Sequence, residues 1–383
     1  MTSKLTTKTS LFTGGIKNQH MESAAAEKMW SSLSVAIDQI FTQKTSSLSF
    51  NELYNYGYQL VIHKHGDLLY NGVQRSVKTH LEKLLLIVSN TPNETLLSAV
   101  KHTWDEYKTT SHNLKDILMY LDRTWVAQQK KTPVATLMVQ IFRDVIILNA
   151  DVSGRLRSLI LDNVQQERMG VLIDRELMKA VLSMLVDLGP DGQDVYESFF
   201  EAPFLAATKA FYRQLSQEYL QQNTCPDYMV MAEARLQEED DRVVHFLSPT
   251  SGSKLRTVCE QELIAAHART LIELETSGCH VMFQNDRIED LRRMYGLFHR
   301  LPPTLDGLRD FMAAYVKTCG TKVRPLLPPL LLLLLLSRLP PPPSHPLPLP
   351  PPSALSPRLS PQIVADQEVR HTGPCPILPI LPI

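Results

Sequence analysis

The chain has 383 residues, of which 44% are hydrophobic and 21% charged, so most of it can bury a core and its length suggests two or three domains. The formal net charge of -1 argues against a nucleic-acid-binding protein, which usually carries a basic excess, and against polybasic attachment to a membrane. The five cysteines are scattered and form no CxxC pair, so we expect neither a disulfide framework nor a cysteine zinc site. A reducing compartment, cytoplasm or nucleus, fits best.

The first 27 residues are rich in Ser, Thr and Lys and lack the apolar core of a signal peptide. We therefore expect a flexible N-terminal extension over residues 1–27. The longest apolar run, seven leucines at 330–336 between prolines, would span roughly 10 Å as a helix, well short of a hydrocarbon layer of roughly 30 Å. No transmembrane segment is expected.

From residue 27 to residue 322 apolar residues recur at helical spacing, and we find no convincing period-two strand. A first helix is expected around 30–41. The second begins at a capping box of Ser49 and Glu52, with Leu48 and Leu53 at the hydrophobic-staple positions, and stops near Gly66. Further helices are expected near residues 72–88, 93–108, 111–129, 134–148, 154–169, 174–188, 196–222, 226–246, 255–277, 287–298 and 305–320. This rhythm favours antiparallel helical bundles stacked end to end.

The composition changes abruptly near Val323, because 18 of the 26 prolines lie in the last 61 residues. Proline disfavours both helix and sheet, so residues 323–383 are expected to form a low-complexity tail, disordered or in polyproline II conformation. The tail could serve as a ligand for proline-recognition domains. It could also be translated from a wrong frame or an intron, and the abrupt switch inside an amphipathic helix favours that interpretation.

No phosphate-binding glycine loop, nucleophile elbow or HExxH motif is present, so we expect no enzyme, cofactor or metal. His63 and His65 stand two residues apart, which on a helix directs them away from each other. The acidic run at 238–241 is expected to be a solvated helix face. Cys259 and Cys279 have no obvious basic neighbour and are expected in the core. The residues alone indicate an all-helical, non-catalytic interaction protein.

Three segments carry longer motifs, in the same order as one known family. The first fits Y-x-x-x-F-E-x-x-F-L-x-x-T-x-x-F-Y and consists of Tyr196, Phe200, Glu201, Phe204, Leu205, Thr208, Phe211 and Tyr212. The second fits R-L-x-E-E-x-x-R and consists of Arg235, Leu236, Glu238, Glu239 and Arg242. The third fits D-L-x-x-M-Y-x-L and consists of Asp290, Leu291, Met294, Tyr295 and Leu297. Together with a fourth, shorter segment formed by Leu263, Ile264, His267 and Leu271, they resemble the cullin family.

Within that family the N-terminal third resembles the cullin-3 branch, through the segments LSFNELY at 48–54, HKHGDLLY at 63–70 and DILMYLDR at 116–123. The resemblance covers about residues 28–320. It implies an all-α elongated stalk of stacked five-helix cullin repeats, with a first repeat at 28–150 and a second at 151–265. A third repeat at 266–322 is expected to be truncated.

The resemblance also implies a partner, namely the BTB-domain substrate adaptors that bring proteins to be ubiquitinated. In the cullin-3 branch the contact is made by the second and fifth helices of the first repeat. The candidate contact residues here are Phe50, Tyr54, Tyr58 and Tyr120, with Leu48 and Asn51 beside them.

The spacing gives this assignment separate support, because residues 50, 54 and 58 form one i, i+4, i+8 row on a helix. A second row of Leu53, Gly57, Leu60 and Val61 runs beside it. Tyrosine suits a binding surface, since it offers a large rigid area with a polar tip. The alternative is a single wide core stripe that contains both rows.

Two departures from the family pattern bear on function. The N-terminal stretch around Phe12 and Ile16 matches poorly the apolar extension that packs on the adaptor. The resemblance ends near Val323, so the region that binds the RING protein and carries the modifier-acceptor lysine is expected to be absent, and no RING protein is expected on this chain.

We therefore expect a scaffold arm of a cullin-RING ubiquitin ligase, with dimeric adaptors able to bring two copies together. The alternatives are a helical tethering or trafficking module and an incomplete gene product without an independent role. In the last case the final helix would leave one apolar stripe exposed, formed by Leu308, Phe311, Met312, Tyr315 and Val316.

Overall fold

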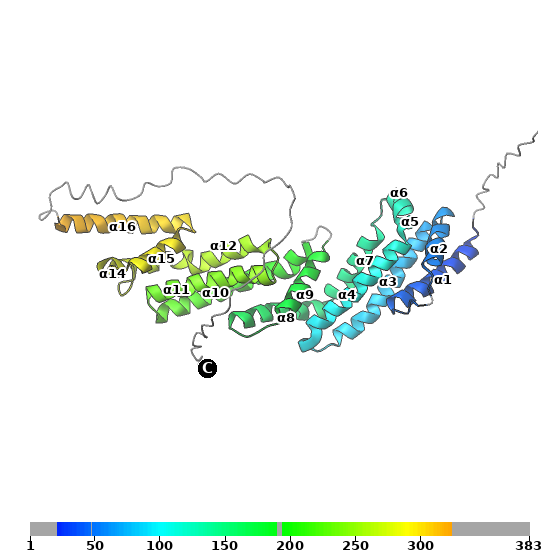
Figure 1. Cartoon of the computed structure of the whole chain (residues 1–383), viewed down its shortest axis with the longest axis horizontal. Coiled ribbons are helices and arrows are strands. Elements are labelled where there is room, and N and C mark those ends of the chain that lie inside the picture. The colour runs from blue at the N-terminus through cyan, green and yellow to red at the C-terminus, as the bar shows by residue number, and fades with distance from the viewer. Residues whose placement is uncertain (1–20, 47, 190–193, 324–383) are drawn as a thin grey trace, which may run out of the picture. The chain divides into compact units, whose positions relative to one another are not determined.

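The computed structural model describes residues 21–46, 48–189 and 194–323, and every regular element among them is helical (Figure 1). The predicted all-α class is therefore confirmed for the described chain. Phe12, Ile16 and the tail from residue 324 lie outside the described residues. None of the described helices is long and apolar enough to cross a membrane.

The helices follow one another with short connections. In chain order they are α1 Ser23–Phe41, α2 Phe50–Ile62, α3 Gly66–Ser89, α4 Asn93–Ile117, α5 Met119–Leu121, α6 Ala127–Gln129, α7 Val134–Phe142, α8 Ala150–Arg168, α9 Arg175–Asp187, α10 Ala202–Gln222, α11 Cys225–His245, α12 Ser251–Leu263, α13 Ala268–Glu273, α14 Cys279–Gln284, α15 Ile288–Phe298 and α16 Pro302–Val323. Three π-helical turns lie between them, η1 Asp122–Val126, η2 Arg143–Ile147 and η3 Tyr196–Glu201, and one 3-10 turn, η4 Ala265–His267. Residues up to Thr318 form one unit, and beyond it the structure describes only the end of α16.

The two helices expected at 93–108 and 111–129 are wrong, because α4 runs without interruption from Asn93 to Ile117. Thr109 and Thr110 lie inside it, and their hydroxyls donate to the carbonyl oxygens of Asp105 and Glu106 at 3.1 and 3.0 Å. Such bonds to the preceding turn let hydroxyl residues sit within a helix. The break comes instead after residue 117, ahead of the short helix α5.

Gly66 does not end the second helix, as the sequence suggested, but begins the third. α2 stops at Ile62, and Lys64 takes the left-handed conformation at φ 67° that turns the chain. Gly66 is buried, and a Cβ atom there would lie 2.4 Å from Cδ1 of Trp125. Glycine is required at this position by close packing and not by helix termination.

The long helix expected at 255–277 is also wrong. α12 ends at Leu263, whose carbonyl oxygen accepts a hydrogen bond from the Tyr228 hydroxyl at 2.8 Å. The 3-10 turn follows, and within it His267 Nε2 lies 2.9 Å from the Ser216 hydroxyl. The partner residues Tyr228 and Ser216 lie on α11 and α10, and they fix the backbone between α12 and α13. The sequence did not predict α14.

The apolar stripe of the last helix is only partly exposed, contrary to the expectation. Leu308 is buried, and Phe311 is half-buried against the core. The Tyr315 ring stacks on Phe283 of α14, with 5.0 Å between ring centroids. Only Met312 and Val316 remain exposed, at 37% and 50%. The helix that the sequence did not predict thus covers the Tyr315 part of the stripe.

Candidate partner-binding site

Four aromatic side chains form a continuous surface that we call the aromatic row: Phe50, Tyr54, Tyr58 and Tyr120. Along α2 the ring centroids of Phe50 and Tyr54 lie 6.3 Å apart, and those of Tyr54 and Tyr58 6.5 Å apart, with nearly parallel planes. Tyr120 comes from α5 and places its ring 4.6 Å from that of Tyr58, tilted by 58°. The structure thus brings together residues 62 positions apart in the sequence (120 − 58).

Burial separates the aromatic row from the core row of the same helix. Leu53, Gly57 and Leu60 are the buried residues of α2. Phe50 is 53% exposed, and the three tyrosines are half-buried. One wide core stripe therefore does not describe α2.

The other predicted contact residues differ from one another in their surroundings. Asn51 is exposed at the second position of α2, next to the aromatic row. Leu48 is half-buried and packs against the core, so only part of its surface can meet a partner. Partner binding by all six residues stays a prediction.

Tyr120 is held by contacts made around a short and irregular segment. The Thr124 hydroxyl donates to the carbonyl oxygen of Tyr120 at 2.6 Å. The Asp122 carboxylate accepts a hydrogen bond from the backbone N–H of Val134 at 2.9 Å and so ties the segment to the start of α7. Burial raises the pKa of Asp122, although the Val134 N–H and Lys115 favour its charged form.

Trp125 anchors the far side of the same segment. Its ring lies against Gly66 of α3 and 5.5 Å from the Tyr70 ring, between centroids. The Lys131 ammonium lies 5.4 Å from the Trp125 ring centroid, within the range of a cation–π contact. The Tyr70 hydroxyl donates to the carbonyl oxygen of Thr132 at 2.9 Å. Sequence reasoning singled out Gly66 only as a helix stop and did not assign this role to any of these residues, because the role depends on contacts across the fold.

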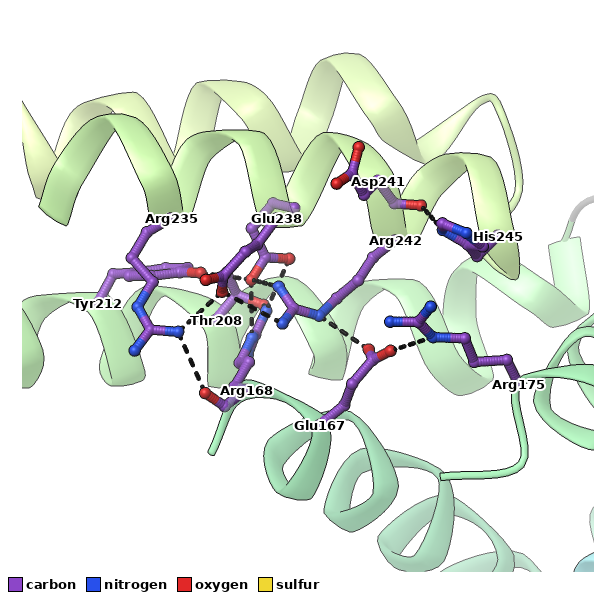
Figure 2. Close-up of polar contacts among 11 residues, drawn as sticks. Glu167, Arg168, Arg175, Thr208, Tyr212, Arg235, Glu238, Asp241, Arg242 and His245 are labelled. Carbon is purple, nitrogen blue, oxygen red and sulfur yellow. Dashed lines mark hydrogen bonds and ion pairs between the residues drawn. The ribbon is translucent and has the colours of Figure 1, made fainter. Parts of the chain in front are cut away.

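Apart from the aromatic row, a cluster of charged and polar side chains lies buried between α8, α10 and α11 (Figure 2). Glu239 receives Nε of Arg168 at 2.8 Å, Nη1 of Arg242 at 2.8 Å and the Tyr212 hydroxyl at 2.5 Å. The Arg168 and Glu239 side chains are only 2% and 3% exposed. Glu239 is therefore not part of a solvated acidic face, as the sequence suggested, but the centre of a buried charged cluster.

Further partners complete the cluster. Glu167 receives Nε of Arg242 at 2.9 Å and Nε of Arg175 at 2.6 Å. Arg168 also donates to the Thr208 hydroxyl at 2.8 Å. The buried guanidinium groups thus face carboxylates, which satisfies groups that are costly to bury alone. Burial, and next the Glu239 carboxylate, raise the pKa of Tyr212, so its hydroxyl remains a donor.

Four residues of the first two sequence motifs belong to the cluster. They are Thr208 and Tyr212 of the first motif and Glu239 and Arg242 of the second. Arg168, 40 or more residues from these partners, could not be recognised from the motifs. The arrangement ties α8, α10 and α11 together.

The remaining candidates for chemistry fall into structural positions. His63 follows the end of α2, and Nε2 of His65 lies 3.2 Å from the carbonyl oxygen of Met21. Cys259 and Cys279 are buried, as predicted, and burial raises the pKa of the Cys279 thiol to about 12. Across the described ranges, no group of three or more His, Cys, Asp or Glu side chains is placed to hold a metal ion.

Successive helices joined by short connections, with a row of partly exposed aromatic rings on α2 and α5, define an α-solenoid interaction scaffold. The sequence matches the Cullin alpha solenoid domain over residues 30–326, and the chain belongs to the cullin family. The matched domain is a scaffold and not a catalytic domain.

Curated relatives point to one branch of that family. The chain is 42% identical to Cullin-3 of Dictyostelium discoideum over 294 residues, which cover 77% of this chain and 38% of that protein. It is 39% identical to Cullin-3A of Arabidopsis thaliana over 298 residues, or 78% of this chain and 40% of that protein. Cullin-3 of Caenorhabditis elegans is 30% identical over 304 residues. The chain thus spans about two-fifths of the length of the first two relatives.

Proposed function

We propose that the chain is the adaptor-binding arm of a cullin-RING ubiquitin ligase scaffold and that its aromatic row binds BTB-domain substrate adaptors. The partial exposure of these rings, with Phe50 the most open, beside a separate buried row on α2 is the observation that carries the proposal. Rigid aromatic side chains with polar tips supply much of the energy at protein interfaces. Similarity to the cullin-3 branch supports the choice of adaptor class.

The arm would act by positioning. A stalk of helical repeats, divided near residues 150 and 265, would hold an adaptor and its substrate at a fixed separation from the ubiquitin-transfer machinery. Holding two reactants in place converts an encounter into an effectively unimolecular step and needs no reactive group on the scaffold. We place this work in the cytoplasm and nucleus. Dimeric adaptors would bring two arms together, and no RING protein is expected to bind the matched region.

Alanine at both Tyr58 and Tyr120 tests the proposal. The two rings make the closest contact of the aromatic row, so we expect the double variant to bind a BTB-domain adaptor about 10- to 100-fold more weakly than the unchanged chain. Titration calorimetry or a quantitative pull-down measures the difference.

The matched control is Tyr295→Ala, which removes a 52% exposed tyrosine from α15 and should leave adaptor binding unchanged. Equal binding by the double variant and the unchanged chain would remove the tyrosines from the interface. Recovery of vesicle-tethering proteins in place of BTB proteins would favour a tethering module instead.

A further inference from the structure

We infer that Gly66 is a positioning residue of the aromatic row, because its missing side chain gives Trp125 the space that fixes the segment carrying Tyr120. The inference goes beyond the proposed function and rests on it only where adaptor binding is measured. Gly66 itself is buried at the start of α3 and does not belong to the aromatic row.

The segment that carries Tyr120, formed by α5 and the π-helical turn η1, does not fix its own position. α5, the π-helical turn η1 and α6 follow one another without a break from residue 119 to residue 129, and these eleven residues fall short of the roughly 12–15 that an isolated helix needs to be even marginally stable. Leu118, between α4 and α5, departs from helical geometry at φ −97° and ψ 13°. The direction of Tyr120 is therefore set by contacts that the segment makes with its neighbours.

Two glycines, Gly57 of α2 and Gly66 of α3, pack against the segment or the residues just before it. At Gly57 of α2 an added Cβ would lie 3.7 Å from the carbonyl oxygen of Ile117 and 3.7 Å from Leu118, which is ordinary van der Waals contact. At Gly66 it would lie 2.4, 2.5 and 2.9 Å from three indole carbons of Trp125. Atoms cannot approach so closely, so a side chain at residue 66 must displace Trp125.

The Trp125 ring is half-buried and packs against neighbours on α3 and beyond α6. Tyr70 and Lys131 flank its ring at 5.5 and 5.4 Å. Its backbone lies in the same π-helical turn as Thr124, which is bonded to the carbonyl oxygen of Tyr120. A side chain at residue 66 therefore displaces Trp125, and the displacement passes along the π-helical turn to Tyr120. The distance between the ring centroids of Tyr58 and Tyr120, 4.6 Å in the structure, then increases.

The chain offers a matched control on the same helix. At Gly72 of α3 an added Cβ would also lie 2.4 Å from an indole carbon, here of Trp30 on α1. Gly66→Ala and Gly72→Ala thus introduce the same kind of collision six residues apart. Only the first collision involves the segment that carries Tyr120.

The experiment measures two quantities in the full chain with protonated tyrosine rings in a deuterated background. One is the nuclear Overhauser contact between the Tyr58 and Tyr120 rings, and the other is the dissociation constant for a BTB-domain adaptor. We expect Gly66→Ala to lose the ring contact and to weaken adaptor binding about tenfold or more. Gly72→Ala should lower the melting temperature comparably and keep both the ring contact and the affinity.

A Trp125→Ala background provides the specific readout. Without the indole, the three atoms nearest to the added methyl group at residue 66 are gone, so Gly66→Ala should change neither quantity in that background. Persistence of the Tyr58–Tyr120 contact in Gly66→Ala, its equal loss in Gly72→Ala, or an effect of Gly66→Ala that does not depend on Trp125 would each overturn the inference. Absence of adaptor binding by the unchanged chain would contradict the proposed function, and the ring contact would still decide the role of Gly66.

Discussion

Glu239 lies in a run of four acidic residues, and its sequence neighbours give no sign that it differs from them. Glu238 and Asp241 are surface groups that pair with Arg235 and Gln237. Glu239 instead enters the core and meets Arg168, which is 71 residues away. A helical pattern can say which residues share a face, but an ion pair between distant helices depends on how the helices pack.

Removing the Glu239 carboxylate should be costly, because it leaves two buried guanidinium groups short of a counter-charge. We expect Glu239→Ala to lower the free energy of unfolding by about 3–5 kcal/mol, the usual cost of breaking a buried charge pair. Asp241→Ala, in the same acidic run, should change it by less than about 0.5 kcal/mol. Urea denaturation followed by circular dichroism measures both, and similar losses would show that Glu239 is not a structural centre.

At the helix starts, a capping motif in the sequence is not always accompanied by the capping hydrogen bond that it predicts. Ser49 precedes α2 as the sequence suggested, but its side chain makes no capping hydrogen bond, and Glu52 accepts one from Tyr56 at 2.5 Å instead. At the start of α9, Asp174 does cap, since its carboxylate accepts from the Leu177 N–H at 2.9 Å. The predicted position of the start held, while the predicted capping box was wrong.

This contrast predicts different costs for two similar substitutions. Asp174→Ala removes a capping bond and should destabilise the chain by about 0.5–2 kcal/mol, whereas Ser49→Ala removes none and should cost less than about 0.5 kcal/mol. The two variants are compared by their midpoints in the same denaturant titration. A larger loss for Ser49→Ala would mean that the Ser49 side chain caps α2 in solution.

At the level of the whole chain, the helical class, the order of most helices and the family could be read from the sequence. Helical spacing reports local geometry, and three motifs in order are hard to produce by chance. The sequence did not predict three features: the break at Leu118, the six-residue helix α14 and the role of Gly66. Each of them is fixed by contacts between distant segments. The helical spacing of residues 50, 54 and 58 predicts the α2 part of the aromatic row. That Tyr120 belongs to the same surface was inferred only from the resemblance to the cullin-3 branch.

We propose that a BTB-domain adaptor binds the aromatic row formed by α2 and α5. Amide hydrogen exchange of the full chain, with and without a saturating adaptor, tests it most directly. We expect slower exchange on binding within residues 50–62 and 118–126 and unchanged exchange within α8–α11, where the charged cluster lies. Protection centred on α8–α16, or binding that leaves exchange in α2 and α5 unaltered, would contradict it.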